Sequence, residues 1–226
     1  MVSLILLSGG KGTRMRKDLP KQYLLLAGKP IIMHSLERVG KIKKIDEIII
    51  VCAEEYISYL QELIKKYNVK VNVKFALAGQ TRQESVYNGL KCVSNSSVLI
   101  HESARPFVLK EEFEKLIEDE SENITYGYSI PYTVAKGKDY FLDTLKREEL
   151  VNIQLPQKFN TKTLIMAHEQ AIKDEALFTE DASMLHKYSK DEIKILEGTS
   201  FNLKITEPID LLIGELIYKE YIIRRK

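Results

Sequence analysis

The stretch that decides the fold is VSLILLSGGKG, residues 2–12. Its first part, Val2–Leu7, is an almost continuous aliphatic run, which is typical of a strand buried on both faces of a parallel sheet. A loop with Gly9, Gly10 and Gly12 follows at once. The run has no basic residues before it and leads directly into this loop, so we interpret it as a first strand and not as a signal peptide.

Outward from this stretch, short β-rich runs alternate with longer periodic segments. Further strands are predicted at Glu47–Cys52, Val71–Ala76 and Val98–His101. Helices are predicted at Ile31–Val39, Glu54–Lys66, Arg82–Val93 and Lys110–Glu118. Because strand–helix alternation is typical of domains with helices on both faces of a parallel sheet, we predict an α/β fold with a Rossmann-like, doubly wound, mostly parallel sheet.

The pattern changes after residue 124. Thr125–Val134 resembles another strand, Lys136–Asp139 a turn, and Tyr140–Gln154 has a mixed pattern. A loop of this length without structure would be unusual. We therefore expect a projecting β-arm at about residues 133–155, which serves dimerisation or covers a site. With no internal repeat or linker in view, residues 1–226 are expected to form a single domain.

The remaining elements are predicted from caps and short apolar runs. They are a helix at Asn160–Lys173, a helix with Thr179 as its N-cap, short strands at Ile193–Leu196 and Phe201–Ile205, and a final helix opened by Glu207 and Pro208.

Composition excludes several classes of protein. The 34 basic and 32 acidic side chains leave a formal charge of +2, without the basic stripe of a nucleic-acid binder. No apolar run approaches the ~20 residues of a membrane span. Cys52 and Cys92 stand alone, so a zinc site or a disulfide framework is not expected, and the predicted location is the cytoplasm.

The glycine-rich loop carries the first functional signal. Glycines let backbone N–H groups approach phosphate oxygens closely, and Arg14 and Lys21 add two cations that suit a polyphosphate. The Gly-Lys-Ser/Thr ending of a P-loop is absent, and Met15 stands where a dinucleotide-binding loop has its third glycine. A tight turn between strand and helix is the alternative.

At this point the chain resembles the cytidylyltransferases of polyol phosphates, the family of 2-C-methyl-D-erythritol 4-phosphate cytidylyltransferase and ribitol-5-phosphate cytidylyltransferase. The resemblance lies in six segments in the family's order, from residue 4 to residue 212. They contain GGKGTRM with PKQY (9–15 and 20–23), AGQTRQESVYNGL (78–90), HESARP (101–106), PQKF (156–159), TEDAS (179–183) and NLKIT with DL (202–206 and 210–211).

The resemblance implies transfer of CMP from CTP to a small polyol phosphate with release of pyrophosphate and with Mg²⁺ as cofactor. It also implies roles for individual residues. The implied roles are catalysis by Arg14, Lys21 and Lys204; nucleotide binding by Ser8, Gly9, Gly10, Gly12, Gly79, Gln80, Ser85 and Glu102; and acceptor binding by Arg105, Arg147 and Thr133. A homodimer formed through the arm is implied as well, with Arg147 serving the neighbouring site.

Structural alternatives stay open for several of these residues. Ser85 is equally consistent with a buried helix serine, Gln80 with a loop residue and Arg105 with a structural ion pair. Lys204 could be a surface lysine whose stem lies along a strand. The four histidines, His34, His101, His168 and His186, are interpreted as structural.

Four departures from the family pattern affect the acceptor and metal sides. Glu102 replaces the aspartate that helps to hold magnesium, so the metal is expected to shift or to bind through water. Leu155 replaces a threonine, and Glu180 replaces an aspartate. The arm is shortened, which leaves Thr133 out of register with the acceptor-binding threonine.

These departures leave several functions in view. A methylerythritol phosphate acceptor is the leading interpretation, and Ser103 and Phe107 resemble the ribitol-type form of the motif. A sugar-1-phosphate nucleotidyltransferase would share only the first loop. A CTP-binding module without turnover is the alternative of another class, because Glu102 changes the metal ligand.

Overall fold

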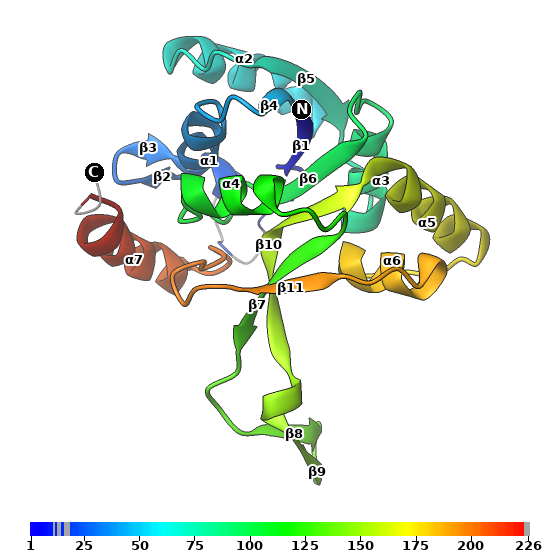
Figure 1. The fold of residues 1–226 in the computed structure, drawn as a ribbon. Helices are drawn as coiled ribbons and strands as arrows, with labels where there is room; N and C mark the ends of the chain where they lie inside the picture. The colour runs from blue at the N-terminus through cyan, green and yellow to red at the C-terminus, as the bar shows by residue number, and fades with distance from the viewer. Residues whose placement is uncertain (11, 13–14, 16–18, 224–226) are drawn as a thin grey trace.

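The computed structural model describes residues 1–10, 12, 15 and 19–223. Its centre is a seven-stranded sheet with the order β11-β7-β10-β6-β1-β4-β5 (Figure 1). The strands are β1 (Val2–Leu7), β4 (Ile45–Cys52), β5 (Asn72–Leu77), β6 (Ser97–Glu102), β7 (Ile124–Ser129), β10 (Val151–Asn160) and β11 (Lys194–Glu197). The helices are α1 (Ile31–Val39), α2 (Ile57–Lys66), α3 (Arg82–Leu90), α4 (Lys110–Glu118), α5 (Thr161–Lys173), α6 (Asp181–Ser189) and α7 (Pro208–Ile217).

The sheet is mostly parallel, as predicted. Strand β1 pairs in parallel with β4 and β6, and β4 pairs in parallel with β5. Strand β10 is antiparallel to both of its neighbours, β6 and β7. The α/β class with a mixed, mostly parallel sheet is therefore confirmed.

Helices cover both faces of the sheet because successive strand residues point to opposite sides. In β1, Leu4 and Leu6 belong to the apolar cluster beneath α1, α2 and α4, whereas Ile5 belongs to the cluster beneath α3, α5 and α6. The same alternation in β4 places Ile48 and Ile50 opposite Ile49. This two-sided burial explains the unbroken aliphatic runs.

One buried carboxylate ties the amino-terminal ends of three strands together. Glu47 is 4% exposed and accepts hydrogen bonds from Lys74 Nζ at 2.6 Å, from the Ser94 backbone at 2.6 Å and from the Ser3 hydroxyl. Burial raises the pKa of Glu47, but these hydrogen bonds outweigh it and lower the pKa from 4.5 to about 2. The carboxylate is therefore charged and satisfied in the folded protein.

The arm projects from the sheet between β7 and β10 (Figure 1). Its outer part is an antiparallel hairpin of β8 (Val134–Gly137) and β9 (Phe141–Leu145). Large apolar side chains in the arm face solvent, with Tyr140 83% and Phe141 71% exposed. A two-stranded hairpin alone is marginally stable in water, so these side chains are a candidate contact surface.

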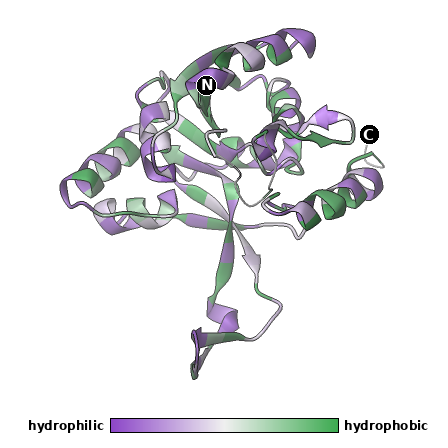
Figure 2. Cartoon of the chain, turned by 180° about the vertical axis from the view of Figure 1, so that it is seen from behind, coloured by the Kyte–Doolittle hydropathy of each residue, from purple (hydrophilic) through white to green (hydrophobic). Residues whose placement is uncertain are grey.

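A second exposed apolar surface follows helix α7. The helix starts at Pro208 after a capping box between Glu207 and Asp210, as the sequence predicts. Figure 2 shows apolar residues along it, and Leu212 and Leu216 are 65% and 64% exposed. Within the described ranges, no helix is long and apolar enough to cross a membrane.

Several predicted bounds differ from the structure, and for three of them the contacts give the reason. The strand predicted at Thr125–Val134 ends at Ser129, just before Pro131, which has no N–H to donate to a ladder. Helix α6 is capped by Glu180 and not by Thr179, because the Glu180 carboxylate accepts from the N–H groups of Ala182 and Ser183. The described residues 201–205 form an extended loop and not a strand.

Candidate active site

A cavity of about 450 Å³ opens at the carboxyl ends of the parallel strands. Strand β1 ends there at Leu7 and β6 at Glu102, and the loop after β5 supplies the third wall. Carboxyl ends of parallel strands are the usual place for a ligand in an open α/β sheet.

Most of the sequence-predicted nucleotide residues meet at this cavity. The predicted residues that line it are Ser8, Gly9, Gly10, Lys21, Gly79, Gln80, Ser85, Glu102 and Lys204. Sequence reasoning missed the lining residues Gln22, Thr81 and Arg82, although all three lie inside the quoted motifs. Gly12 is described but is not a lining residue, and Arg14 lies outside the described residues.

The first loop is held in shape by a buried amide. Gln22 Nε2 donates to the carbonyl of Ser8 at 2.6 Å and to that of Gly10 at 3.1 Å. A side chain at Gly9 would bring its Cβ within 2.3 Å of the Cβ of Ala78, so the two loops pack too closely there for any other residue. The glycine run thus lets two cavity walls meet.

The loop of residues 78–81 is fastened to helix α3 by Ser85. The Ser85 hydroxyl accepts from the Gly79 N–H at 3.0 Å and donates to the Thr81 carbonyl at 2.9 Å. Thr81 in turn caps the helix by accepting from the Glu84 N–H at 3.0 Å. This geometry favours a structural role for Ser85, which holds the wall in place.

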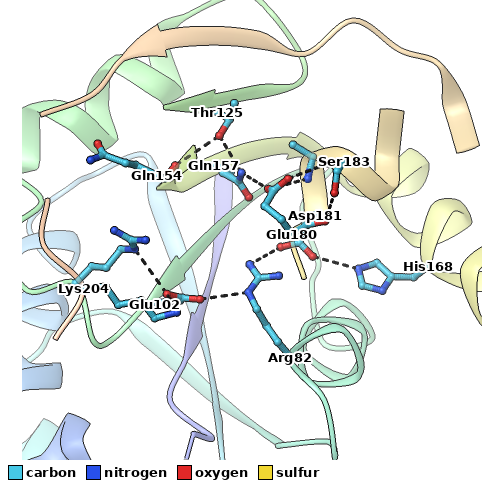
Figure 3. A network of polar contacts seen from close by, with 12 residues as sticks. Arg82, Glu102, Thr125, Gln154, Gln157, His168, Glu180, Asp181, Ser183 and Lys204 are labelled. Carbon is cyan, nitrogen blue, oxygen red and sulfur yellow. Dashed lines mark hydrogen bonds and ion pairs between the residues drawn. The ribbon is translucent and has the colours of Figure 1, made fainter. Parts of the chain in front are cut away.

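Glu102 is a carboxylate set among three cations at the cavity wall (Figure 3). Its Oε2 lies 2.7 Å from Lys204 Nζ and 3.6 Å from Arg105 Nε, and its Oε1 lies 3.2 Å from Arg82 Nε. Burial raises the pKa of Glu102, but Lys204, Arg82 and Arg105 together lower it to about 2. The group is therefore ionised near neutral pH.

Behind Glu102, the network continues away from the cavity through Arg82. Arg82 Nη2 donates to Asp181 Oδ2 at 2.7 Å, and Asp181 Oδ1 lies 3.7 Å from His168 Nε2 (Figure 3). Burial lowers the pKa of His168 to about 4, so the imidazole is neutral near pH 7. The interpretation of His168 as a structural histidine agrees with this position.

The predicted acceptor residues are not among the residues that line the cavity. Arg105 donates from Nη1 to the Asn202 carbonyl at 2.9 Å, so it braces the loop that carries Lys204. Arg147 and Thr133 lie in the arm, where Arg147 Nη1 donates to the Pro131 carbonyl at 3.1 Å. Arg105 therefore lies directly behind the cavity, 3.6 Å from Glu102 Oε2, whereas Arg147 and Thr133 belong to the arm.

The charges of the cavity suit an anionic ligand. Lys21, Arg82 and Lys204 line it, and Glu102 is the carboxylate among the described lining residues. Magnesium is usually held by one or two carboxylates together with substrate phosphates, so Glu102 fits an ion that arrives with a triphosphate. The described residues contain no cluster of three or more His, Cys, Asp or Glu side chains that would hold a metal alone.

The comparisons with known proteins point in one direction. A family model described as IspD, 2-C-methyl-D-erythritol 4-phosphate cytidylyltransferase, matches residues 2–220. The 2-C-methyl-D-erythritol 4-phosphate cytidylyltransferase of Clostridium botulinum strain 657 is 38% identical over 227 residues, covering 96% of this chain and 97% of that protein. The chloroplastic protein of the same name from Oryza sativa subsp. japonica is 38% identical over 225 residues, covering 97% of this chain and 75% of that protein.

A solved structure gives the same result. The 4-diphosphocytidyl-2C-methyl-D-erythritol synthase of Anaerococcus prevotii matches with a TM-score of 0.87 and 26% identity. The match covers 97% of this chain and 96% of that one.

Proposed function

Because this chain belongs to the 2-C-methyl-D-erythritol 4-phosphate cytidylyltransferase family, we propose that the cavity beside Glu102 binds CTP and the methylerythritol phosphate together. The protein is a CTP-dependent cytidylyltransferase of isoprenoid synthesis, as predicted. The observation that carries the assignment of the site is the pair Glu102–Lys204, 2.7 Å apart at the cavity, with Glu102 paired in register with Leu7 at the start of the glycine-rich loop.

In the proposed reaction, a phosphate oxygen of the acceptor attacks the α-phosphorus of CTP. A new P–O bond forms there, the bond from the α-phosphorus to the bridging oxygen breaks, and its electron pair leaves with pyrophosphate. Lys21 and Lys204 stabilise the charge that develops, because preorganised cations at such a centre cost no reorganisation. Glu102 would hold Mg²⁺ together with triphosphate oxygens, and the ion would neutralise phosphate charge when bound.

The remaining roles follow the walls of the cavity. The backbone N–H groups of Gly9 and Gly10 bind the triphosphate, since glycines expose N–H groups to anions. The Ser8 N–H donates to the Val51 carbonyl at 2.8 Å, so the nucleotide-binding role of Ser8 falls to its side chain. The wall made by Gly79 and Gln80 receives the cytidine. Arg14 keeps the catalytic role that the family resemblance gives it, Gly12 keeps its place in the nucleotide-binding loop, and Arg105 acts next to the acceptor by holding the Asn202 segment.

A homodimer through the arm is proposed to complete the acceptor side. Two observations support it: the arm holds Arg147 and Thr133 away from the chain's own cavity, and it exposes apolar side chains such as Phe141. Phe141→Glu should yield a monomer in size-exclusion chromatography with light scattering. Met166→Glu, at a residue 56% exposed on α5, is the matched control. A dimer that survives Phe141→Glu unchanged would argue against the arm contact.

The test of function is pyrophosphate release from CTP and Mg²⁺ with single acceptors. Release with methylerythritol 4-phosphate and none with ribitol 5-phosphate is expected. Release with ribitol 5-phosphate alone would assign ribitol 5-phosphate as the acceptor. CTP binding without pyrophosphate release with any acceptor would favour a CTP-binding module without turnover.

The cytoplasmic location stays a prediction.

A further inference from the structure

Arg82 joins two carboxylates that belong to distant parts of the chain. Its Nε lies 3.2 Å from Glu102 Oε1 at the cavity wall, and its Nη2 lies 2.7 Å from Asp181 Oδ2 on α6 (Figure 3). A guanidinium is planar and its donors are fixed relative to one another, so fixing one side of it orients the other. The position of Asp181 is therefore transmitted to Glu102.

Asp181 is well placed to act as the fixed end of this arrangement. It is 1% exposed and stands at the first turn of α6, which the Glu180 cap holds at its start. The neutral His168 on its other side brings no compensating charge. The charge of Asp181 is thus balanced through Arg82, and Arg82 is held on its far side.

Glu102 needs such support more than an aspartate would. Its side chain has one more rotatable bond than the aspartate of the family pattern, and its two oxygens have different partners. With Oε1 held by Arg82, Oε2 is left facing Lys204 at 2.7 Å and Arg105 at 3.6 Å. Without the Arg82 contact, the carboxylate could rotate and Lys204 would lose its fixed partner.

We propose that Asp181 is a positioning residue, which acts through Arg82 to hold Glu102 in the orientation that sets Lys204 at the cavity. This role rests on the proposed function, because its effect on rate requires cytidylyl transfer at this cavity. When Asp181 loses its charge, the far side of Arg82 is no longer held, so Arg82 no longer fixes the Glu102 carboxylate in the orientation that Lys204, and a magnesium ion if one binds, would meet.

The test is a double-mutant cycle with Asp181→Asn and Glu102→Gln, read as kcat and as the Mg²⁺ concentration for half-maximal rate. Asp181→Asn should lower kcat about tenfold and raise the Mg²⁺ requirement. In the Glu102→Gln background, Asp181→Asn should change kcat by less than about twofold, because Glu102, through which Asp181 acts, is already altered. If Asp181→Asn lowered kcat by the same factor in both backgrounds, Asp181 would be a merely structural residue and the proposal would be overturned.

Glu180→Gln is the matched control, since Glu180 caps α6 beside Asp181 and its carboxylate accepts hydrogen bonds from Gln157 and from the Ala182 and Ser183 N–H groups. Glu180→Gln should lower the melting temperature, and its effect on kcat should be the same with and without Glu102→Gln. If Asp181→Asn does not fold, Asp181→Ser replaces it, with room left for a water molecule. Thermal unfolding of every variant establishes that the assays report folded protein.

The activity of the wild-type protein separates a failure of the proposed function from a failure of the positioning role. A wild-type protein inactive with every acceptor contradicts the proposed function, and the cycle is then read as the affinity for CTP with Mg²⁺ by calorimetry. Coupling between residues 181 and 102 in that affinity would support the positioning role, and additivity would overturn it. An active wild type with an additive cycle overturns the positioning role alone.

Discussion

Lys204 allows catalysis and stability to be separated in one experiment. Its Nζ lies 2.7 Å from Glu102 Oε2, and its side chain is 38% exposed. An ion pair this accessible to water contributes less than about 1 kcal/mol to folding, which in a chain of this size is a melting shift of about 2–4 °C. Removing a preorganised charge from the reacting phosphorus costs far more, about 2.7–4 kcal/mol or roughly 100- to 1,000-fold in kcat.

Lys204→Met keeps most of the stem of the side chain and removes its charge. The assays are steady-state pyrophosphate release and thermal unfolding of the same preparation. We expect a kcat lowered roughly 100-fold or more and a nearly unchanged melting temperature.

The chain offers a matched control in Lys194, whose Nζ lies 2.7 Å from Asp119 Oδ2 with the side chain 47% exposed. Lys194→Met removes an ion pair of the same length away from the cavity and should leave kcat within about twofold, because surface pairs contribute little. A Lys204→Met protein that keeps a third of the wild-type kcat, or equal losses in the two variants, would refute the catalytic role.

Three further predictions concern other parts of the molecule. Lys21→Ala should remove about 2–4 kcal/mol of transition-state stabilisation and lower kcat accordingly. An unchanged rate constant in single-turnover kinetics would remove Lys21 from the mechanism. The pKa of Glu47 is lowered from 4.5 to about 2, so Glu47 should contribute about 3 kcal/mol to the free energy of unfolding above pH 4.5, and this contribution is lost as the pH falls toward 2. In urea unfolding, the free energy of unfolding of Glu47→Gln should therefore depend less on pH than that of the wild type between pH 4.5 and pH 2. Arg147→Ala should raise the Michaelis constant for the acceptor more than that for CTP, whereas Lys146→Ala, the neighbouring arm variant, should change neither.

The fold was predictable where one physical cause dominates. Ile31–Val39 and Lys110–Glu118 were predicted as helices with the bounds that the structure shows, because their apolar positions repeat with the helical period. Strand β1 was predicted in the same way from burial on both faces. In each case the local pattern and the tertiary packing agree.

The failures occur where tertiary contacts decide. Phe201–Ile205 alternates like a strand, but the Ile205 N–H donates to the Ala104 carbonyl at 2.8 Å and the Asn202 side chain donates to the Leu155 carbonyl at 2.6 Å. Single contacts to different segments satisfy this loop, and no ladder forms within it. Thr179 was preferred as a cap on propensity, yet the longer Glu180 side chain reaches two N–H groups.

The site could be predicted only in part. Motif resemblance located the glycine-rich loop, Glu102 and Lys204, because these residues lie inside contiguous segments. The pairing of Arg82 with Asp181 joins positions 99 residues apart, which no local pattern reveals. Sequence reasoning therefore named Glu102, Lys204 and Arg105 but missed Arg82 and Asp181.

The pairing of Glu102 with Lys204 also sets the order in which the site can appear as the chain leaves the ribosome. Synthesis at about 5–20 residues per second separates the two residues by roughly 5–20 s. During that interval the glycine-rich loop and Glu102 already exist, Asp181 is added late, and Lys204 is added only at its end. CTP in the cell therefore encounters a nascent chain whose cavity still lacks Lys204. Its binding can stabilise the completed protein but not the growing one.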